Sequence, residues 1–121
     1  MENKQSSNKY DLEERTFQFA KNVCLYTKKL KRTDSNIEYS KQVIRSSASV
    51  GSNYIEANEA LSKKDFRMRI KICRKESKES AFFLRLIVET NEENVQEEGT
   101  ALRNEATEFV KIFSAILLKS E

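Results

Sequence analysis

The sequence contains no histidine, no proline and no tryptophan, and only two glycines and two cysteines in 121 residues. Without histidine, the chain cannot form a Ser-His-Asp or Cys-His catalytic group or a histidine-ligated metal site. A β-sandwich or β-barrel needs many glycine- and proline-bearing turns, and a Rossmann or P-loop site needs a glycine-rich loop. The composition therefore excludes these folds and sites and favours an all-helical chain.

Charged residues are abundant, with 22 Lys and Arg against 19 Asp and Glu, which gives a net charge of +3. Only 38% of the residues are hydrophobic, so each helix has room for a narrow apolar stripe. Such stripes are typical of a helical bundle, and they often leave a face that only oligomerisation covers. The basic residues gather in 63–78 and the glutamates in 89–108, which predicts one basic helix followed by an acidic helix start.

No segment has the pattern of a targeting signal or a membrane span. The first nine residues are polar and lack the apolar core of a signal peptide. The longest apolar candidate, 109–118, is interrupted by Lys111 and Ser114 and is shorter than the roughly 18 residues that a span needs. Cys24 and Cys73 lack CxxC spacing and fall on apolar faces, which is typical of reduced, buried thiols. We expect a cytoplasmic protein that does not bind membranes.

Apolar residues recur at steps of three and four, which predicts four helices joined by short connections. Asp34 or Ser35 is expected to cap the second helix, and Ser62 with Asp65 forms a variant of the capping box before the third. Residues 1–10 are expected to be a disordered polar tail, and residues 11–121 a single antiparallel up-down-up-down four-helix bundle. The expected helices cover about 11–31, 34–61, 62–90 and 95–119.

The second helix contains a stretch of weak helix formers around Gly51. Glycine alone costs about 1 kcal/mol relative to alanine inside a helix, so a break into two shorter helices is the alternative. The apolar spacing stays in phase across this stretch, and we therefore expect one continuous helix. The small residues would let a neighbouring helix approach closely.

Several strings carry a resemblance to a known family. Residues 45–57 read RSSASVGSNYIEA, residues 62–66 read SKKDF, and residues 71–79 read KICRKESKE. Together with RTFQFA at 15–20, they resemble the small proteins encoded within intervening sequences of bacterial 23S ribosomal RNA genes. The resemblance extends over roughly residues 11–118, although the fourth helix matches only in pattern. A second departure is Phe82-Phe83, where the family tends toward Tyr-Trp.

The resemblance implies a four-helix protomer that assembles as a homo-oligomer, commonly a pentameric ring. Members are often labelled ribosomal proteins because of their gene context. Close relatives include accessory proteins of diversity-generating retroelements, which bind nucleic acid and a reverse transcriptase. The family therefore implies nucleic acid or a protein as the partner of this chain.

Eight basic side chains of the third expected helix form a candidate nucleic-acid surface. Most recur at three- and four-residue steps, so they share one side of the helix, where each neutralised phosphate would release counterions. Together with the resemblance, this predicts non-catalytic RNA binding. No aromatic-rich RNP motif is present, so base-specific readout is not expected. The eight residues are Lys63, Lys64, Arg67, Arg69, Lys71, Arg74, Lys75 and Lys78.

Two other interpretations of this basic surface stay open. A run of charge is often simply a solvated helix face. The surface could instead dock an acidic protein partner, or pair with the acidic segment around residues 92–98 of the same or a neighbouring subunit. In the second case, the protein would be an interaction scaffold without a nucleic-acid role.

Two pairs of glutamates allow an enzymatic alternative. Glu56 with Glu59, and Glu76 with Glu79, each have i,i+3 spacing and resemble the Mg²⁺ cage of all-α nucleotide pyrophosphohydrolases. That family normally ends the second pair with Asp. Ion pairs on the helix surface, such as Lys75 with Glu79, are the simpler interpretation. We therefore expect no catalytic residue, no metal site and no cofactor.

Asn53 and Glu56 lie one helical turn apart within the string at 45–57. They could contact a ligand or a neighbouring subunit. They could instead satisfy polar groups where two helices cross, with Arg45 or Tyr54 as the partner. We favour the second interpretation and expect a structural polar network of Arg45, Asn53 and Glu56.

Overall fold

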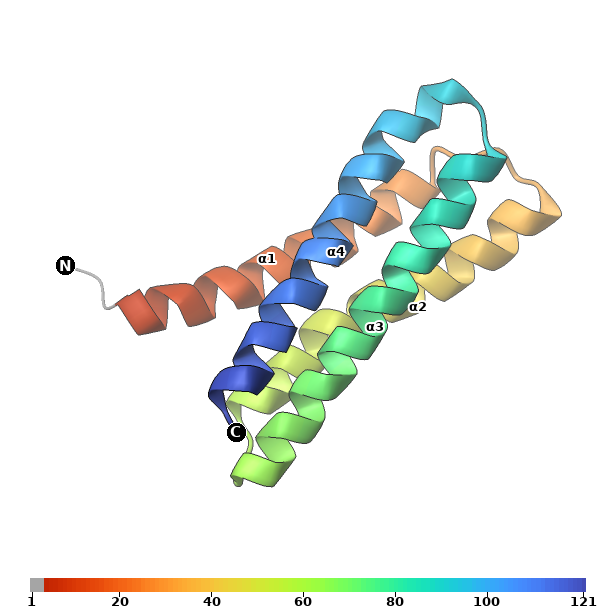
Figure 1. Ribbon diagram of the computed structural model, residues 1–121. Helices are drawn as coiled ribbons and strands as arrows, with labels where there is room; N and C mark the ends of the chain where they lie inside the picture. The colour runs from red at the N-terminus through yellow and green to blue at the C-terminus, as the bar shows by residue number, and fades with distance from the viewer. Residues whose placement is uncertain (1–3) are drawn as a thin grey trace.

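The computed structural model describes the backbone of residues 4–121 and the side chains of residues 12–121. It contains four long helices, and the described residues form no strand (Figure 1). The predicted all-α four-helix fold is therefore confirmed. The elements are α1 (Lys4–Thr27), α2 (Asp34–Asn58), α3 (Lys63–Thr90), the short 3-10 helix η1 (Glu93–Val95) and α4 (Gln96–Lys119).

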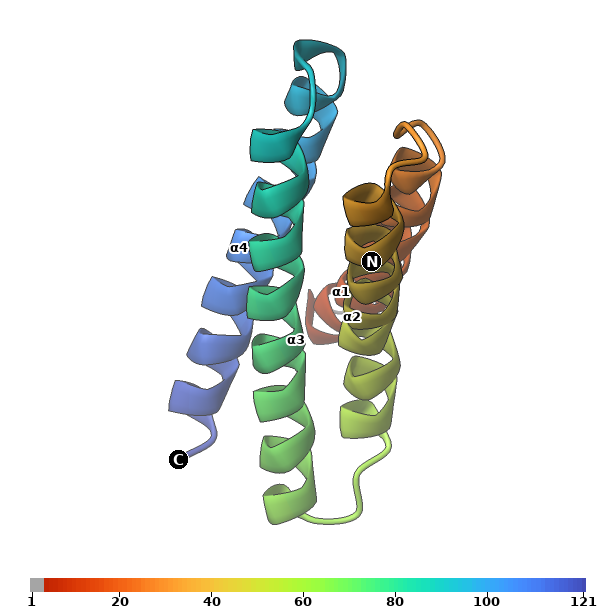
Figure 2. The same ribbon diagram turned by 90° about the vertical axis from the view of Figure 1, so that its right-hand side faces the viewer.

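Helices that follow each other in the chain pack side by side in opposite directions. A residue early in one helix meets a residue late in the next, as where Arg67 of α3 donates to the carbonyl of Leu117 in α4. Arg15 of α1 likewise reaches Glu105 of α4 and closes the bundle. Figure 2 shows α3 and α4 on one side and α1 and α2 on the other. α3 packs extensively against both α2 and α4, whereas α1 contacts mainly α2.

Aromatic rings fill the centre of the bundle. The ring of Phe19 in α1 meets that of Phe109 in α4 edge-on, with centroids 5.3 Å apart. Tyr54 of α2 meets Phe113 of α4 at 5.9 Å. Such aromatic pairs stabilise a core by about 0.5–1.5 kcal/mol each beyond the apolar area that they bury. They tie three of the four helices together at one level.

Small residues bring α2 close to its neighbours. α2 is continuous through Gly51, as the in-phase apolar spacing predicts. A Cβ atom at Gly51 would lie 3.0 Å from Oγ1 of Thr16, so glycine allows α1 to approach. On the side of α3, the buried hydroxyls of Ser46 and Ser80 share a hydrogen bond of 2.8 Å. The close helix approach expected for this stretch is confirmed.

Some helix ends differ from the sequence prediction. Thr33, rather than Asp34 or Ser35, caps α2, because its Oγ1 accepts a hydrogen bond from the amide of Asn36 at 3.1 Å. α2 ends at Asn58 rather than near residue 61, so Leu61 lies in the connection and is fully exposed. Ser62 caps α3 as predicted, with its Oγ accepting from the amide of Asp65.

The first helix begins at Lys4, earlier than the expected start near Asp11, and ends at Thr27 rather than Lys31. No glycine or proline in residues 4–10 interrupts the backbone, so the helix extends into the polar segment. Residues 1–3 of the expected polar tail lie outside the described residues. The division into a disordered tail of residues 1–10 and one domain of residues 11–121 stays a prediction.

Cys24 and Cys73 are both free thiols. Cys73 is fully buried in the core, and its Sγ lies 3.4 Å from the carbonyl oxygen of Val50. Burial raises the pKa of the Cys73 thiol to about 12. Cys24 is only half-buried, so the predicted burial is confirmed for Cys73 alone. Within the part of the chain that the structure describes, no helix is long and apolar enough to cross a membrane.

Candidate nucleic-acid interface

α3 buries one side and exposes a line of lysines on the other. Ile70, Cys73 and Leu84 are fully buried against the other helices. Lys64, Lys71, Lys75 and Lys78 are exposed and follow one another at steps of seven, four and three residues, which places them on one face. From Lys64 to Lys78 the line extends roughly 21 Å along the helix axis. A surface of this length can contact several phosphates at once.

Six of the eight predicted residues are available to a ligand. None of them forms a salt bridge with an acidic side chain in residues 12–121. Five are exposed and Arg74 is half-buried at the edge of the same surface. At the start of the helix this surface includes an open hollow of about 510 Å³ around Met68. We call these six residues the α3 basic face: Lys63, Lys64, Lys71, Arg74, Lys75 and Lys78.

The other two predicted residues are held by the fold itself. Arg67 donates to the carbonyl of Leu117 at 2.7 Å and to the hydroxyl of Ser120. It therefore adds a side-chain donor to a carbonyl in the last turn of α4, which otherwise accepts only from Ser120. Arg69 donates to Oδ1 of Asn53 in α2 at 3.0 Å. Both arginines join α3 to its neighbours.

The carboxylates near the middle and end of α3 are also paired. Glu76 is nearly buried, and its carboxylate lies 3.3 Å from Arg45 of α2. The same arginine binds Glu79, so the predicted ion pair of Glu79 with Lys75 is not formed. Nearly two turns further along the helix, Arg85 hydrogen-bonds Glu89 and lowers the pKa of the Glu89 carboxyl. These pairs remove most of the negative charge that would oppose a phosphate.

The expected network of Arg45, Asn53 and Glu56 does not exist as one unit. Arg45 binds the two glutamates of α3, whereas Asn53 bonds Ser49 and Arg69. Glu56 is exposed. Arg45 and Asn53 lie more than two turns apart, roughly 12 Å along the helix axis, so their side chains serve different partners.

The two glutamate pairs of the enzymatic alternative lie apart as well. Glu76 and Glu79 face Arg45, whereas Glu56 and Glu59 lie near the end of α2, about 16 Å further along it. They do not form one cage. Among the described residues, no group of three or more Cys, Asp or Glu side chains is placed to hold a metal ion.

Comparison with known proteins identifies the family. The model of the family described as "23S rRNA-intervening sequence protein" matches residues 8–115. The chain belongs to this family. The resemblance seen in the sequence strings is thereby confirmed over almost the whole chain.

A solved structure has the same fold as this chain. It is the crystal structure of a protein of unknown function from the S23 ribosomal protein family of Bacteroides thetaiotaomicron. The two chains are 29% identical, with a TM-score of 0.79 over 90% of this chain and 96% of that one. A search of curated proteins finds no significant match. The comparisons therefore establish the fold and the family.

The acidic segment of this family member lies at the other end of the bundle from the start of α3 (Figure 1). Glu92 pairs with Lys31 at 2.9 Å, and Glu98 pairs with Lys29 at 2.9 Å. Both lysines belong to the connection after α1. The acidic segment thus balances a different set of lysines, and its described carboxylates form no ion pair with the α3 basic face.

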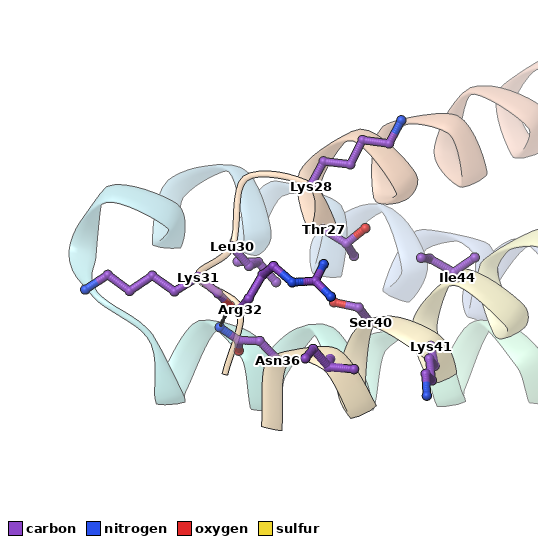
Figure 3. Close-up of a pocket in the computed structure, with 10 residues that line it drawn as sticks. Thr27, Lys28, Leu30, Lys31, Arg32, Asn36, Ser40, Lys41 and Ile44 are labelled. Atoms are coloured by element: carbon purple, nitrogen blue, oxygen red, sulfur yellow. Dashed lines mark hydrogen bonds between the residues drawn. The ribbon is translucent and has the colours of Figure 1, made fainter. Parts of the chain in front are cut away.

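A second basic surface, which sequence analysis missed, surrounds a hollow of about 260 Å³ between α1 and α2 (Figure 3). Ile44 lines this hollow and is 41% exposed. Figure 3 shows the guanidinium of Arg32 beside the hydroxyl of Ser40. The run KKLKR at 28–32 was the signal for it. The basic residues at this hollow are Lys28, Lys31, Arg32 and Lys41.

Proposed function

We propose that this family member is a non-catalytic RNA-binding protein whose contact surface is the α3 basic face. The observation that carries the proposal is the set of six cations on one side of α3 that form no ion pair with the described acidic residues. A phosphate chain laid along this side would meet a cation every one or two turns. Each contact would release counterions and add affinity that falls with salt.

RNA is favoured over DNA by the description of the family, which links its members to 23S rRNA intervening sequences. The surface offers lysines rather than a recognition helix with base-reading side chains. We therefore expect binding that depends on phosphates and shape more than on sequence. The cytoplasmic location expected from the sequence stays a prediction.

The protein is proposed to act as a homo-oligomer. Three large apolar side chains of α1 and α2 are exposed: Phe17 is 60%, Ile55 is 52% and Ile44 is 41% accessible. Burying them against another subunit would stabilise an assembly by about 25 cal/mol for each Å² of apolar area. A pentameric ring, as the family resemblance implies, is the form we expect. A ring would also present several copies of the α3 basic face to one RNA.

The competing function is that of a protein-interaction scaffold. The α3 basic face could bind an acidic protein segment, and the exposed Glu92 and Glu93 of a neighbouring subunit offer one. In that case, the lysines would hold the oligomer together. A charge reversal on α3 would remove RNA binding in the first case and would dissociate the oligomer in the second.

A triple charge reversal tests the proposal. We expect Lys71→Glu, Lys75→Glu and Lys78→Glu together to weaken binding of a labelled structured RNA at least about 100-fold at low salt. The slope of log affinity against log salt should fall by about two to three, because each lost phosphate contact contributes roughly 0.7–0.9. Arg67 is left intact because its removal would expose the end of α4.

The matched control reverses three cations at the hollow between α1 and α2, with Lys28→Glu, Arg32→Glu and Lys41→Glu. This control changes the net charge by the same amount as the triple reversal on α3. Equal losses of RNA affinity in both variants would mean that only the overall charge matters. Absence of RNA binding by the unmodified protein at low salt would refute the proposal. If the α3 variant dissociates the oligomer, as seen by light scattering, the surface is a protein interface.

A further inference from the structure

Beside the lysines, α3 exposes an aromatic ring. We infer that Phe82 is a stacking platform for an unpaired base, so that the α3 basic face takes a single-stranded RNA segment. This inference rests on the proposed function, because it names the form of RNA that the same surface binds. Phe82 is 58% exposed, so the face of its ring is accessible to a ligand.

Phe82 continues the line of lysines on α3. It follows Lys78 by four residues and Lys75 by seven, the spacings that place side chains on one helix face. The ring therefore lies about one turn, roughly 6 Å, beyond the last lysine. That separation is close to the distance between neighbouring nucleotides along an extended strand. A strand whose phosphates contact Lys75 and Lys78 would bring its next base to the ring.

The ring is held in place by its neighbour. Phe83 is half-buried, packs against the core and lies 6.3 Å from the ring of Tyr39. Phe82 meets Phe83 edge-on, with centroids 5.4 Å apart and an angle of 82° between the planes. A ring supported in this way loses little freedom when a base stacks on it, which favours binding.

The charges around Phe82 also suit a phosphate chain. Two carboxylates are near Phe82 in the sequence, and each forms an ion pair with an arginine: Glu79 with Arg45, and Glu89 with Arg85. Lys78 has no carboxylate partner in residues 12–121. A nucleotide at the ring would therefore meet positive charge on the side of Lys78 and neutral pairs elsewhere.

An aromatic platform distinguishes unpaired from paired RNA. In an A-form duplex the bases stack on one another, and the major groove is too deep and narrow for a side chain to read. A duplex could contact the lysines through its phosphates but could not stack a base on Phe82. Stacking accepts every base because each has a π face, so the inference requires no sequence-specific motif.

The test compares Phe82→Leu with Leu118→Ala, which removes an exposed apolar side chain from α4. The probes are a fluorescently labelled single-stranded RNA and a blunt duplex of the same length. We expect Phe82→Leu to weaken single-strand binding about tenfold, as for the loss of one base stack, and to leave duplex binding unchanged. Leu118→Ala should change neither. Phe82→Trp should restore single-strand binding.

A second readout follows the base itself. A 2-aminopurine in the single strand should lose fluorescence on binding the unmodified protein and stay bright with Phe82→Leu at saturation. Normal single-strand binding by Phe82→Leu, with the triple lysine variant inactive, would overturn the inference and leave the proposed function intact. A change in oligomer mass caused by Phe82→Leu would also overturn it. If both Phe82→Leu and the triple lysine variant bind RNA normally, the proposed function itself is refuted.

Discussion

In the described part of the chain, charged residues at the α1–α2 and α3–α4 connections are paired with one another, whereas those of the α3 basic face are not. Where the connection after α1 meets the turn after α3, Lys31 pairs with Glu92, and Asn36 and Asn91 exchange two hydrogen bonds of 2.9 Å. On the α3 basic face, the cations find no carboxylate among residues 12–121. A charge is structural where the fold brings an opposite charge within reach, and it is available to a ligand where the fold does not.

The bundle topology explains this difference. The α1–α2 and α3–α4 connections lie at the same end, so the basic run of one meets the acidic run of the other (Figure 1). The outer side of α3 faces neither connection. Mutations at the paired end should therefore change stability, and mutations on the α3 basic face should change binding.

The largest effect on stability is expected at Gly99, at the paired end. A Cβ atom there would overlap the hydroxyl of Tyr26 and approach a methyl group of Val88. We expect Gly99→Ala to lower the free energy of unfolding by about 2 kcal/mol, since overpacking outweighs the gain in helix propensity. Denaturant unfolding measures this change.

The matched control for that variant is Gly51→Ala, whose Cβ would lie 3.0 Å from Oγ1 and 3.3 Å from Cβ of Thr16. Gly51→Ala should lower the free energy of unfolding clearly less than Gly99→Ala does. RNA affinity of folded Gly99→Ala should equal that of the unmodified protein. If Gly99→Ala is as stable as the unmodified protein, the contact between Gly99 and Tyr26 is not tight.

A smaller effect is expected from the proton of Tyr26. Its buried hydroxyl donates to the carbonyl of Val95 at 2.7 Å, and burial raises its pKa from 10 to about 12. Between these values the unfolded chain loses the proton and the folded protein keeps it, so stability falls as pH rises. The slope approaches about 1.4 kcal/mol per pH unit.

Tyr26→Phe isolates this contribution. It should be less stable than the unmodified protein at pH 8, because the hydrogen bond to Val95 is lost. The difference should shrink between pH 10 and pH 11, while contributions from Cys73 and the lysines are common to both proteins. A difference that does not change with pH would contradict the assignment.

The smallest effect is expected at Glu92. Lys31 hydrogen-bonds this exposed carboxylate and lowers its pKa, so the pair stabilises the fold near neutral pH and ceases to do so as pH falls below about 4.5. Glu92→Gln should therefore lower the thermal midpoint slightly at pH 7 and not at pH 3. The decrease should be smaller than that of Gly99→Ala and should disappear in 1 M salt. A large decrease would mean that this pair anchors the end of the bundle.

Much of the fold followed from sequence patterns. The three- and four-residue spacing of apolar residues predicted four helices, and the phase across Gly51 predicted an unbroken α2. Ser62 was recognised as a cap because its hydroxyl and the amide of Asp65 are near in sequence. Thr33 was missed because three neighbouring residues have similar capping ability, and only the backbone conformation selects one of them.

The amino-acid sequence by itself determined the helices, the apolar stripes and the face of α3 on which the lysines gather, because the helical period relates these features within one segment. Only the tertiary structure decided which cations are available. Arg67 follows Lys64 by three residues and precedes Lys71 by four, the spacing of the basic face, yet the end of α4 engages it. The reason is that contacts between helices depend on how the helices pack, and no spacing along one segment contains that information.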